Sequence, residues 1–226
     1  MNSVFELCLL LILVIMLIAF ILSLFLILLK INDVIDEVKL DIARCQHNTF
    51  DMKKPSIVYR FIKRFFDILL SMFGIFVSSP FIFVSALILK IQGVVTVFWV
   101  KYIIGYKNKR AKEYRLTTLV SDDGIKYRRT NFGKFVYRSC IDNLPVYFSV
   151  FLGHLTIIGL ESISYDDLNK NNADEYKYFR PGIISLSKVV HAETDKKFFN
   201  RVYCKNAGIK YDLKIFFYAL KNVYVR

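Results

Sequence analysis

The sequence predicts an α+β membrane protein with an N-terminal transmembrane helix, a re-entrant hairpin made from a broken helix, and a small, mostly helical cytosolic domain with a few short strands. The hydrophobic fraction is 55% over 226 residues, which is high for a soluble globule. Two long apolar stretches account for the excess, and the second, residues 65–89, is interrupted by Ser79 and Pro80. In addition, 24 of the 32 Lys and Arg residues lie from Lys90 onward. We expect three segments, over residues 1–30, 31–59 and 60–226, with the hairpin at residues 65–89 inside the third.

The first segment reads as a retained transmembrane helix. Residues 4–29 are apolar apart from Glu6 and Ser23, which is long enough to cross a hydrocarbon core of about 30 Å. It lacks the basic start and the small-residue cleavage site of a signal peptide. Lys and Arg residues follow this stretch, and none precedes it. The positive-inside bias therefore predicts that the amino terminus faces outward.

The second segment carries a short amphipathic pattern. Apolar residues recur at helical spacing between acidic ones, at Ile31, Val34, Ile35, Val38 and Ile42. This pattern predicts a helix that lies on the membrane surface or pairs with a partner chain. A linker is expected at residues 53–55.

The second apolar stretch has basic residues on both sides, which makes its path through a membrane unusual. A straight span would carry one basic flank, and everything beyond it, across the bilayer, against the positive-inside bias. A helix that breaks at Pro80 and leaves by the same face satisfies both flanks, because proline removes an amide donor and disfavours a helical residue before it. Neighbouring serine hydroxyls can cap the exposed backbone groups. The alternative is an ordinary kinked span.

The part beyond Lys90 is long enough for a small core. Strands are expected at residues 94–100 and 114–120, where β-branched and aromatic residues gather. The remaining expectations are a basic loop at 106–112, turns at 121–124 and 180–182, a polar surface segment at 166–174, and helices at 131–138, 144–152 (interrupted by Pro145) and 212–223.

The formal charge of +13 favours anionic partners. Beside membrane segments, lipid headgroups and phosphorylated substrates fit better than nucleic acid, which we exclude. The four cysteines include no Cys-x-x-Cys pair, and the three histidines are scattered. Neither a disulfide framework nor a zinc site is predicted.

Asp142-Asn143-Leu144-Pro145 is the candidate catalytic motif. An Asp or Asn before a helix is often only a cap. Next to a membrane hairpin and a basic domain, however, a carboxylate could attack a phosphorus atom and form a covalent phospho-enzyme. Mg²⁺ would then neutralise a diphosphate, and Lys or Arg would hold its remaining oxygens.

From about Arg60 to the carboxyl terminus, the chain resembles the bacterial sugar transferases, the monotopic polyprenyl-phosphate phosphoglycosyl transferases. Lys63-Arg64-Phe65-Phe66-Asp67 resembles the family's Lys-Arg-x-x-Asp, and Ser79-Pro80 falls at its membrane break. Asp142-Asn143-Leu144-Pro145 lies on its Asp-Glu-Leu-Pro. The other matches, in family order, are Gly105, Asn131 to Phe135, Gly153 to Gly159, Arg180 to Ile183 and Asp212 to Lys214.

The resemblance implies transfer of a sugar phosphate from a nucleotide diphosphate-sugar to undecaprenyl phosphate, with release of the nucleoside monophosphate. The domain would face the cytosol from the bacterial inner membrane. Asp142 would be the nucleophile and a Mg²⁺ ligand. Asp67, Ser79 and Pro80 would be structural, and substrate phosphates would meet Lys63, Arg64, Lys101, Arg138 and Arg180. The alternatives are interfacial anchors for Lys63 and Arg64, and solvated surface charges for Lys101 and Arg138.

Several departures from the family pattern fall at the chemistry. Asn143 replaces the dyad glutamate and offers an oxygen but no charge. Glu161 stands in place of the arginine of Pro-Arg-Pro, and an acid would repel a phosphate. Ile103 and Thr117 replace two further arginines, and Ile184-Ser185-Leu186 replaces Thr-Gly-Trp. Lys101, Lys107, Arg115, Arg138 and Lys188 are the basic residues that could rebuild phosphate binding.

Three hypotheses follow: a divergent active transferase, a catalytically impaired homologue that partners an active transferase, and a non-enzymatic membrane scaffold. The scaffold would pair with other membrane proteins, or with a second copy of this chain, through residues 31–50. A crosslink from Cys45 to such a partner would reveal it.

Overall fold

The computed structural model describes residues 16–18, 22–23, 30–45, 54–121, 127–167, 174–191 and 195–224. Most of the expected transmembrane helix within residues 1–30 lies outside these ranges. Parts of the expected turn at 121–124 and of the polar segment at 166–174 do so too.

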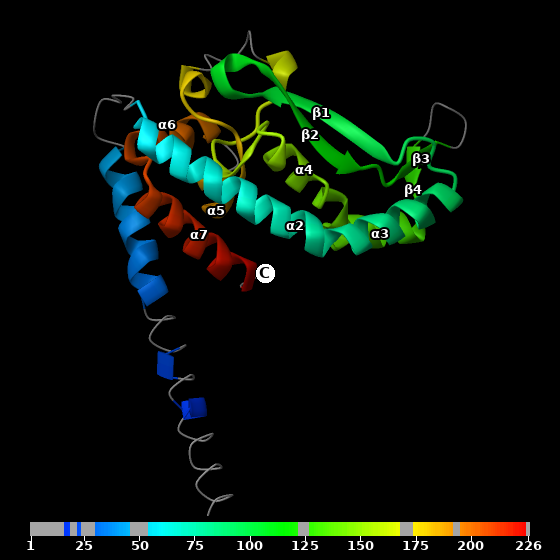
Figure 1. Ribbon diagram of the computed structural model, residues 1–226, viewed down its shortest axis with the longest axis horizontal. Coiled ribbons are helices and arrows are strands. Elements are labelled where there is room, and N and C mark those ends of the chain that lie inside the picture. Colours follow the sequence, from blue (N-terminus) through cyan, green and yellow to red (C-terminus); the bar gives the residue numbers. More distant parts are fainter. Residues whose placement is uncertain are drawn as a thin grey trace, which may run out of the picture.

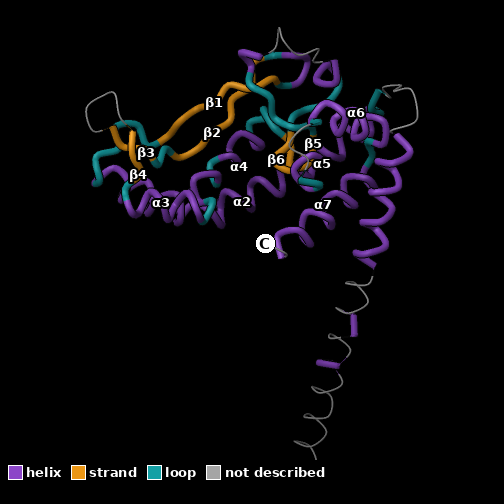
Figure 2. Tube along the Cα trace, turned by 180° about the vertical axis from the view of Figure 1, so that it is seen from behind, coloured by secondary structure: helices purple, strands orange, loops and turns teal. Residues whose placement is uncertain are grey.

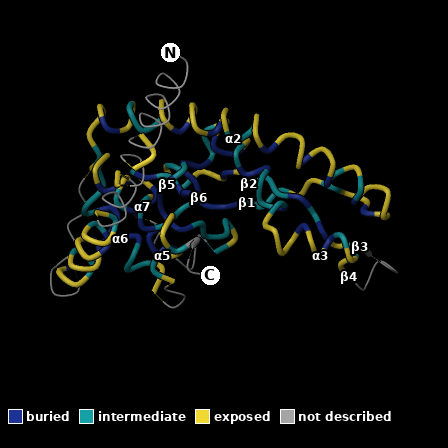
Figure 3. The backbone as a smooth tube through the Cα atoms, turned by 90° about the horizontal axis from the view of Figure 1, so that it is seen from below, coloured by how far each residue is buried: buried dark blue, intermediate teal, exposed yellow. Residues whose placement is uncertain are grey.

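A single long helix, α2 (Ile57–Ile91, 35 residues), runs along one side of the domain (Figure 1). Its sequence is apolar on nearly all sides, so it exposes many large hydrophobic side chains, such as Phe61, Phe73 and Phe76. Figure 3 shows it mostly as exposed backbone with short buried stretches. Within the described ranges it is the one helix that is long and apolar enough to cross a membrane.

The predicted break of this helix was wrong, because α2 continues through Pro80. Figures 1 and 3 show a helix that changes direction along its length and does not fold back into a hairpin. Pro80 cannot donate to the carbonyl of Phe76, but the Ser79 hydroxyl donates to that carbonyl over 3.1 Å. The lost backbone bond is thereby replaced locally. A re-entrant path through a membrane stays a prediction.

An antiparallel ribbon of β1 (Phe98–Ile104) and β2 (Arg110–Leu116) lies on the far side of the short helix α4 from α2 (Figures 1 and 2). Both strands are shifted from their expected positions at 94–100 and 114–120. The expected basic loop at 106–112 is shorter, because η1 (Tyr106–Asn108) makes the turn. Lys107 and Asn108 adopt positive φ there, so the chain reverses tightly and re-enters the ribbon.

The next elements follow the sequence expectation more closely. After the β3–β4 hairpin (Leu119–Ser121 and Tyr127–Arg129), α3 spans Asn131–Arg138 as expected. The Thr130 hydroxyl accepts a hydrogen bond from the Gly133 amide at 3.0 Å and caps this helix. Pro145 then occupies the N-cap of α4 (Val146–Phe151). The interruption expected at this proline separates the 3₁₀ turn η2 (Ile141–Asn143) from α4.

The last part of the chain forms a parallel pair and a helical layer. β5 (Thr156–Gly159) pairs with β6 (Gly182–Ser185) at the close approach of Gly159 and Gly182. A Cβ on Gly182 would lie 2.2 Å from the Gly159 nitrogen, so a side chain there would force the strands apart. The other elements are η3 (Tyr165–Asp167), η4 (Asp174–Lys177), α5 (Leu186–Val189), α6 (Lys196–Asn206) and α7 (Ile209–Tyr224).

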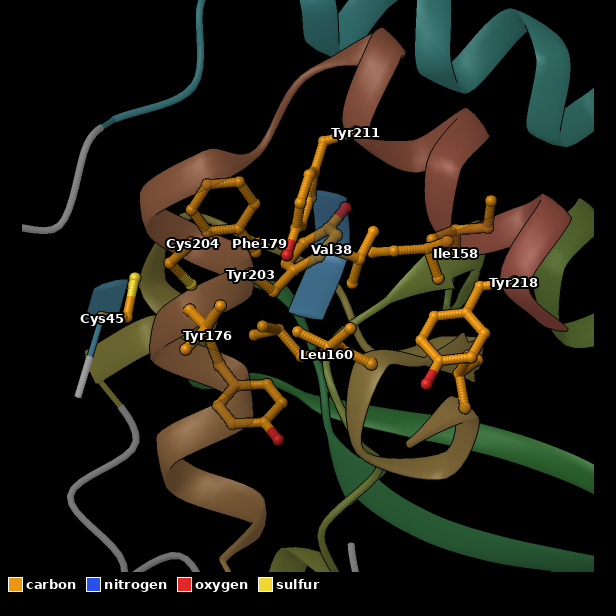
Figure 4. Packing of buried hydrophobic residues seen from close by; sticks show 14 of the residues in the cluster. Val38, Cys45, Ile158, Leu160, Tyr176, Phe179, Tyr203, Cys204, Tyr211 and Tyr218 are labelled. Atoms are coloured by element: carbon orange, nitrogen blue, oxygen red, sulfur yellow. The ribbon is translucent and has the colours of Figure 1, made fainter. Parts of the chain in front are cut away.

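The main core includes the segment before the linker, which corrects another expectation. Residues 30–45 are helical, and Ile35, Val38 and Cys45 are buried in one cluster with Tyr203 and Tyr211 (Figure 4). The apolar face that we expected to meet a membrane surface or a partner chain is covered by this chain's own α6 and α7. Cys45 is 2% exposed, so it is poorly placed for crosslinking to a partner.

Candidate functional site

The candidate nucleophile lies in a constrained turn between α3 and α4. Cys140 adopts a left-handed conformation (φ 58°) immediately before η2. This turn buries Asp142, which is 8% exposed. Asp142 Oδ1 and Asn143 Oδ1 both lack a hydrogen-bond partner within the described residues. Because buried polar atoms are nearly always satisfied, the orphan Asp142 oxygen indicates a place for a ligand.

Asp142 opens onto a pocket of about 580 Å³ between the two strand pairs, α3 and the loop that follows α2. Two arginines, Arg115 from β2 and Arg129 from β4, share this pocket with it. The indole of Trp99 and the phenol of Tyr137 add aromatic surface to the pocket. The lining residues are Val94, Val95, Thr96, Trp99, Arg115, Leu116, Thr117, Thr118, Leu119, Arg129, Tyr137 and Asp142.

Burial raises the pKa of the Asp142 carboxyl above its ordinary value, and the positive charges of Arg115 and Arg129 partly oppose this shift. Each arginine is held in place. Arg115 Nε donates to Glu113 Oε1 over 2.7 Å, and Arg129 Nε donates to Thr118 Oγ1 over 3.2 Å. The Arg129 guanidinium also lies 4.0 Å from the centroid of the Tyr137 ring. Two fixed cations beside a carboxylate suit an anionic ligand that the carboxylate can reach.

The residues that sequence reasoning missed are Arg129, Trp99, Tyr137 and Glu113. Ala111, Glu113 and Arg115 alternate along β2 and therefore share one face. Glu113 is buried, and its second oxygen has no partner within the described residues. This alternation is present in the sequence, but the strand predicted at 114–120 begins after Glu113 and so does not include it. The approach of Arg129 depends on the β3–β4 hairpin. The sequence indicated a turn at 121–124 but not the second strand, so it did not place Arg129.

The oxygens near Asp142 fit Mg²⁺ only as part of a larger coordination shell. Asp142 supplies a carboxylate oxygen that lines the pocket, of the hard type that Mg²⁺ prefers. The amide oxygen of Asn143 is of the same type, but Asn143 is not among the residues that line this pocket. The described residues contain no group of three His, Cys, Asp or Glu side chains that could enclose a metal. Such an ion would therefore depend on water and on substrate phosphates for its remaining ligands, which is usual for Mg²⁺ in phosphoryl-transfer sites.

The structure places three predicted site residues at the joint between α2 and the domain. Asp67 is buried and accepts hydrogen bonds from the Thr156 hydroxyl (2.6 Å) and the Ile157 amide (2.9 Å). Lys63 forms an ion pair with Asp212 at 2.5 Å. Arg64 donates to the backbone carbonyls of two residues at the end of α4, Val150 and Phe151, over 2.7 Å each. All three side chains hold α2 against the domain.

The other predicted basic residues do not line the Asp142 pocket. Lys101 lies opposite Glu113 across the β1–β2 ribbon, and Arg138 is exposed in the last turn of α3. Arg180 lies near the start of α2, with its guanidinium 5.0 Å from the centroid of the Tyr106 ring. Within the described residues, the basic side chains gathered around Asp142 are Arg115 and Arg129.

Comparison with known proteins identifies the family. The family model described as "Bacterial sugar transferase" matches residues 58–226. The chain belongs to the bacterial sugar transferase family. Within this family, the Aeromonas hydrophila protein named UDP-N-acetylgalactosamine-undecaprenyl-phosphate N-acetylgalactosaminephosphotransferase is 27% identical over 206 residues, covering 82% of this chain and 49% of that protein.

Two further relatives differ in length. The Klebsiella pneumoniae UDP-glucose:undecaprenyl-phosphate glucose-1-phosphate transferase is 28% identical over 69% of this chain and 38% of its own length. The Rhizobium leguminosarum exopolysaccharide production protein PSS is 25% identical over 69% of this chain and 92% of its own length. The chain thus spans about half or less of the first two relatives and nearly all of the third.

One departure from the sugar transferase pattern has a structural explanation. Glu161, at the expected arginine of Pro-Arg-Pro, is buried and does not line the Asp142 pocket. Its carboxylate accepts hydrogen bonds from the hydroxyls of Ser185 and Ser187, the latter over 2.8 Å. Ser185 lies within the replaced Thr-Gly-Trp motif, so the two altered motifs meet as one hydrogen-bonded cluster. The acid that we expected to repel a substrate phosphate is satisfied inside the fold.

Proposed function

We propose that this sugar transferase moves a sugar phosphate from a nucleotide diphosphate-sugar to polyprenyl phosphate, with Asp142 as the nucleophile. The observation that carries the proposal is the buried Asp142 carboxylate, whose Oδ1 has no partner among the described residues and which shares a pocket with Arg115 and Arg129. Relatives named as undecaprenyl-phosphate sugar phosphotransferases support the same reaction.

In the first step, an Asp142 oxygen attacks the phosphorus that carries the sugar. The bond between that phosphorus and the oxygen bridging the two phosphates breaks, and its electron pair leaves with the nucleoside monophosphate. Arg115 and Arg129 would stabilise the charge on the phosphate oxygens through fixed, charge-assisted hydrogen bonds. The product is a sugar phosphate joined to Asp142 through an acyl-phosphate bond.

In the second step, an oxygen of the lipid phosphate attacks the same phosphorus. The acyl-phosphate bond breaks, the electron pair returns to Asp142, and the sugar diphospholipid leaves. The raised pKa of Asp142 makes the carboxylate a more basic nucleophile than an exposed aspartate, while the arginines keep it available in its ionised form.

Mg²⁺ held by Asp142 and Asn143 would neutralise charge on the diphosphate as its bonds rearrange. Asn143 offers less to such an ion than a glutamate, because its amide oxygen carries no charge. A divergent enzyme with a reduced rate fits this donor set. The domain would work at the cytosolic face of a bacterial inner membrane. The long apolar α2 supports the membrane location.

The alternative, a catalytically impaired homologue that binds lipid-linked substrate or partners an active transferase, is favoured by one observation. Two charged side chains of the family pattern are lost: Asn143 replaces the glutamate of the dyad, and Glu161, which is buried in its own cluster, replaces an arginine. The scaffold hypothesis is weaker, because the apolar face of residues 30–45 is already buried within this chain.

The proposal is tested by incubating purified protein in lipid nanodiscs with Mg²⁺, polyprenyl phosphate and a panel of nucleotide diphosphate-sugars, while nucleoside monophosphate is measured. We expect release with at least one sugar nucleotide and its loss in Asp142→Asn. Release that persists in Asp142→Asn would refute the nucleophile. No release from the wild-type chain or from Asn143→Glu would favour the impaired homologue.

A further inference from the structure

Besides the polar pocket around Asp142, an apolar groove runs along α2. One part, about 280 Å³, lies between α2, β5 and α7. A second part, about 620 Å³, continues beneath the turn that carries Asp142. The two parts share Leu70, Ile157 and Phe216, so we treat them as one feature and call it the α2 groove.

The α2 groove is apolar although charged residues contribute to its wall. Asp67, Lys63 and Asp212 all line the first part. Asp67 is satisfied by Thr156 and Ile157, and Asp212 by Lys63 together with the hydroxyls of two tyrosines. Because these charges are paired with one another, with hydroxyl groups or with the backbone, the surface left to a ligand is almost entirely hydrocarbon. A polar or charged ligand would find little to bind.

The far part of the groove reaches the catalytic turn. Ile141 and Leu144, which flank Asp142 and Asn143 in sequence, line it. None of the groove residues lines the polar pocket of Asp142. The same short turn therefore directs the Asp142 carboxylate into the pocket that contains two arginines. The apolar side chains of Ile141 and Leu144 line the separate, apolar α2 groove.

We infer that the α2 groove binds the isoprenoid chain of the lipid acceptor and guides its phosphate toward Asp142. This inference rests on the proposed function, which requires an acceptor that is anionic at one end and a long hydrocarbon elsewhere. Three features fit that ligand: an apolar lining, an extended shape along the helix that is able to cross a membrane, and an end beneath the reactive turn. A second copy of this chain or another protein bound in the groove would not explain why the groove ends beneath the turn that carries Asp142.

The groove offers a matched pair of variants. Leu70 lines both parts, whereas its neighbour Leu69 lines neither, and both side chains are 48% exposed on the same helix. Leu70→Trp should fill the junction of the two parts. Leu69→Trp adds the same bulk to the same helix outside the groove, so it controls for a general effect on membrane insertion or folding.

The test is photo-crosslinking in nanodiscs with a polyprenyl phosphate that carries a photoreactive group on its isoprenoid chain, followed by mapping of the labelled peptides. We expect labelling of α2 and α7 that unlabelled polyprenyl phosphate displaces. Labelling should fall by about tenfold in Leu70→Trp and remain in Leu69→Trp. Labelling that lies elsewhere, that an equal amount of phosphatidylglycerol displaces as well, or that both variants retain would overturn the inference.

This experiment needs no turnover, so it tests lipid binding in the groove independently of the proposed reaction. If nucleoside monophosphate is never released but the labelling pattern holds, the proposed function fails and the groove stands as a polyprenyl-phosphate site. If turnover is normal and Leu70→Trp leaves both the labelling and the KM for polyprenyl phosphate unchanged, the groove fails and the proposed function stands.

Discussion

At the scale of single residues, the site rests on Asp142 and on what surrounds it. The carboxylate is buried in a turn forced by the left-handed Cys140, and Oδ1 has no partner within the described residues. The sequence was sufficient to single out Asp142 and Asn143 and to name Arg115 as a possible phosphate ligand. It could not place Arg129 or Trp99 beside them, because those approaches depend on how two strand pairs pack.

The burial of Asp142 has a consequence for stability. Its pKa is raised in the folded state, so the fold holds the proton more tightly than the unfolded chain does. Stability therefore decreases as pH rises from the ordinary aspartate value of about 3.9 through the raised pKa, and the full cost is present above it. We expect Asp142→Asn to unfold at an equal or higher temperature than wild type at pH 7.

Thermal unfolding of both proteins in the same detergent at pH 7 and at pH 4 measures this effect, and the advantage of the variant should shrink at pH 4. A variant that is clearly less stable than wild type at pH 7 would contradict the account, since it would assign Asp142 a structural role.

Asn143 allows a gain-of-function prediction. A glutamate at this position restores a charged oxygen beside Asp142 and strengthens any Mg²⁺ bound there. We expect Asn143→Glu to raise the rate of nucleoside monophosphate release by about tenfold or more, in line with the size of electrostatic effects on phosphoryl transfer. Asn143→Gln is the matched control, because it adds the same length without charge. An equal rise in both variants would show that length, and not charge, limits the rate.

At the scale of elements, the sequence predicted only part of how α2 joins the domain. Asp67 was expected to be structural, and it binds the start of β5. Pro80 was expected to break the helix, and it does not. The Ser79 hydroxyl takes over the carbonyl that proline leaves unpaired, a compensation that sequence patterns alone cannot weigh against a true break.

The Asp67 contact predicts a specific loss. Asp67→Ala leaves the Thr156 hydroxyl and the Ile157 amide without their acceptor. At about 1–3 kcal/mol for each of these two unsatisfied groups, it should reduce the free energy of unfolding by about 2–6 kcal/mol. Thr156→Val removes only one of the two bonds and should cost less. Chemical denaturation in detergent measures both. A smaller loss in Asp67→Ala than in Thr156→Val would contradict the arrangement.

At the scale of the whole molecule, the structure joins a long apolar helix, a polar pocket and an apolar groove around one short turn. The mixture of helices and strands with one long apolar helix was predictable, because long apolar stretches and helix signals are local. The β-ribbon register, the parallel β5–β6 pair and the docking of residues 30–45 into the core were not, because they are set by contacts between residues far apart in the chain.

The most direct measurement is to trap the covalent intermediate. Purified protein is incubated with Mg²⁺ and a nucleotide diphosphate-sugar without lipid acceptor, quenched with acid, digested and analysed by mass spectrometry. The account predicts one sugar phosphate on the peptide that contains Asp142, absent from Asp142→Asn and removed when polyprenyl phosphate is added before quenching. Release of nucleoside monophosphate without such an adduct, or with an adduct on another residue, would contradict Asp142 as the nucleophile.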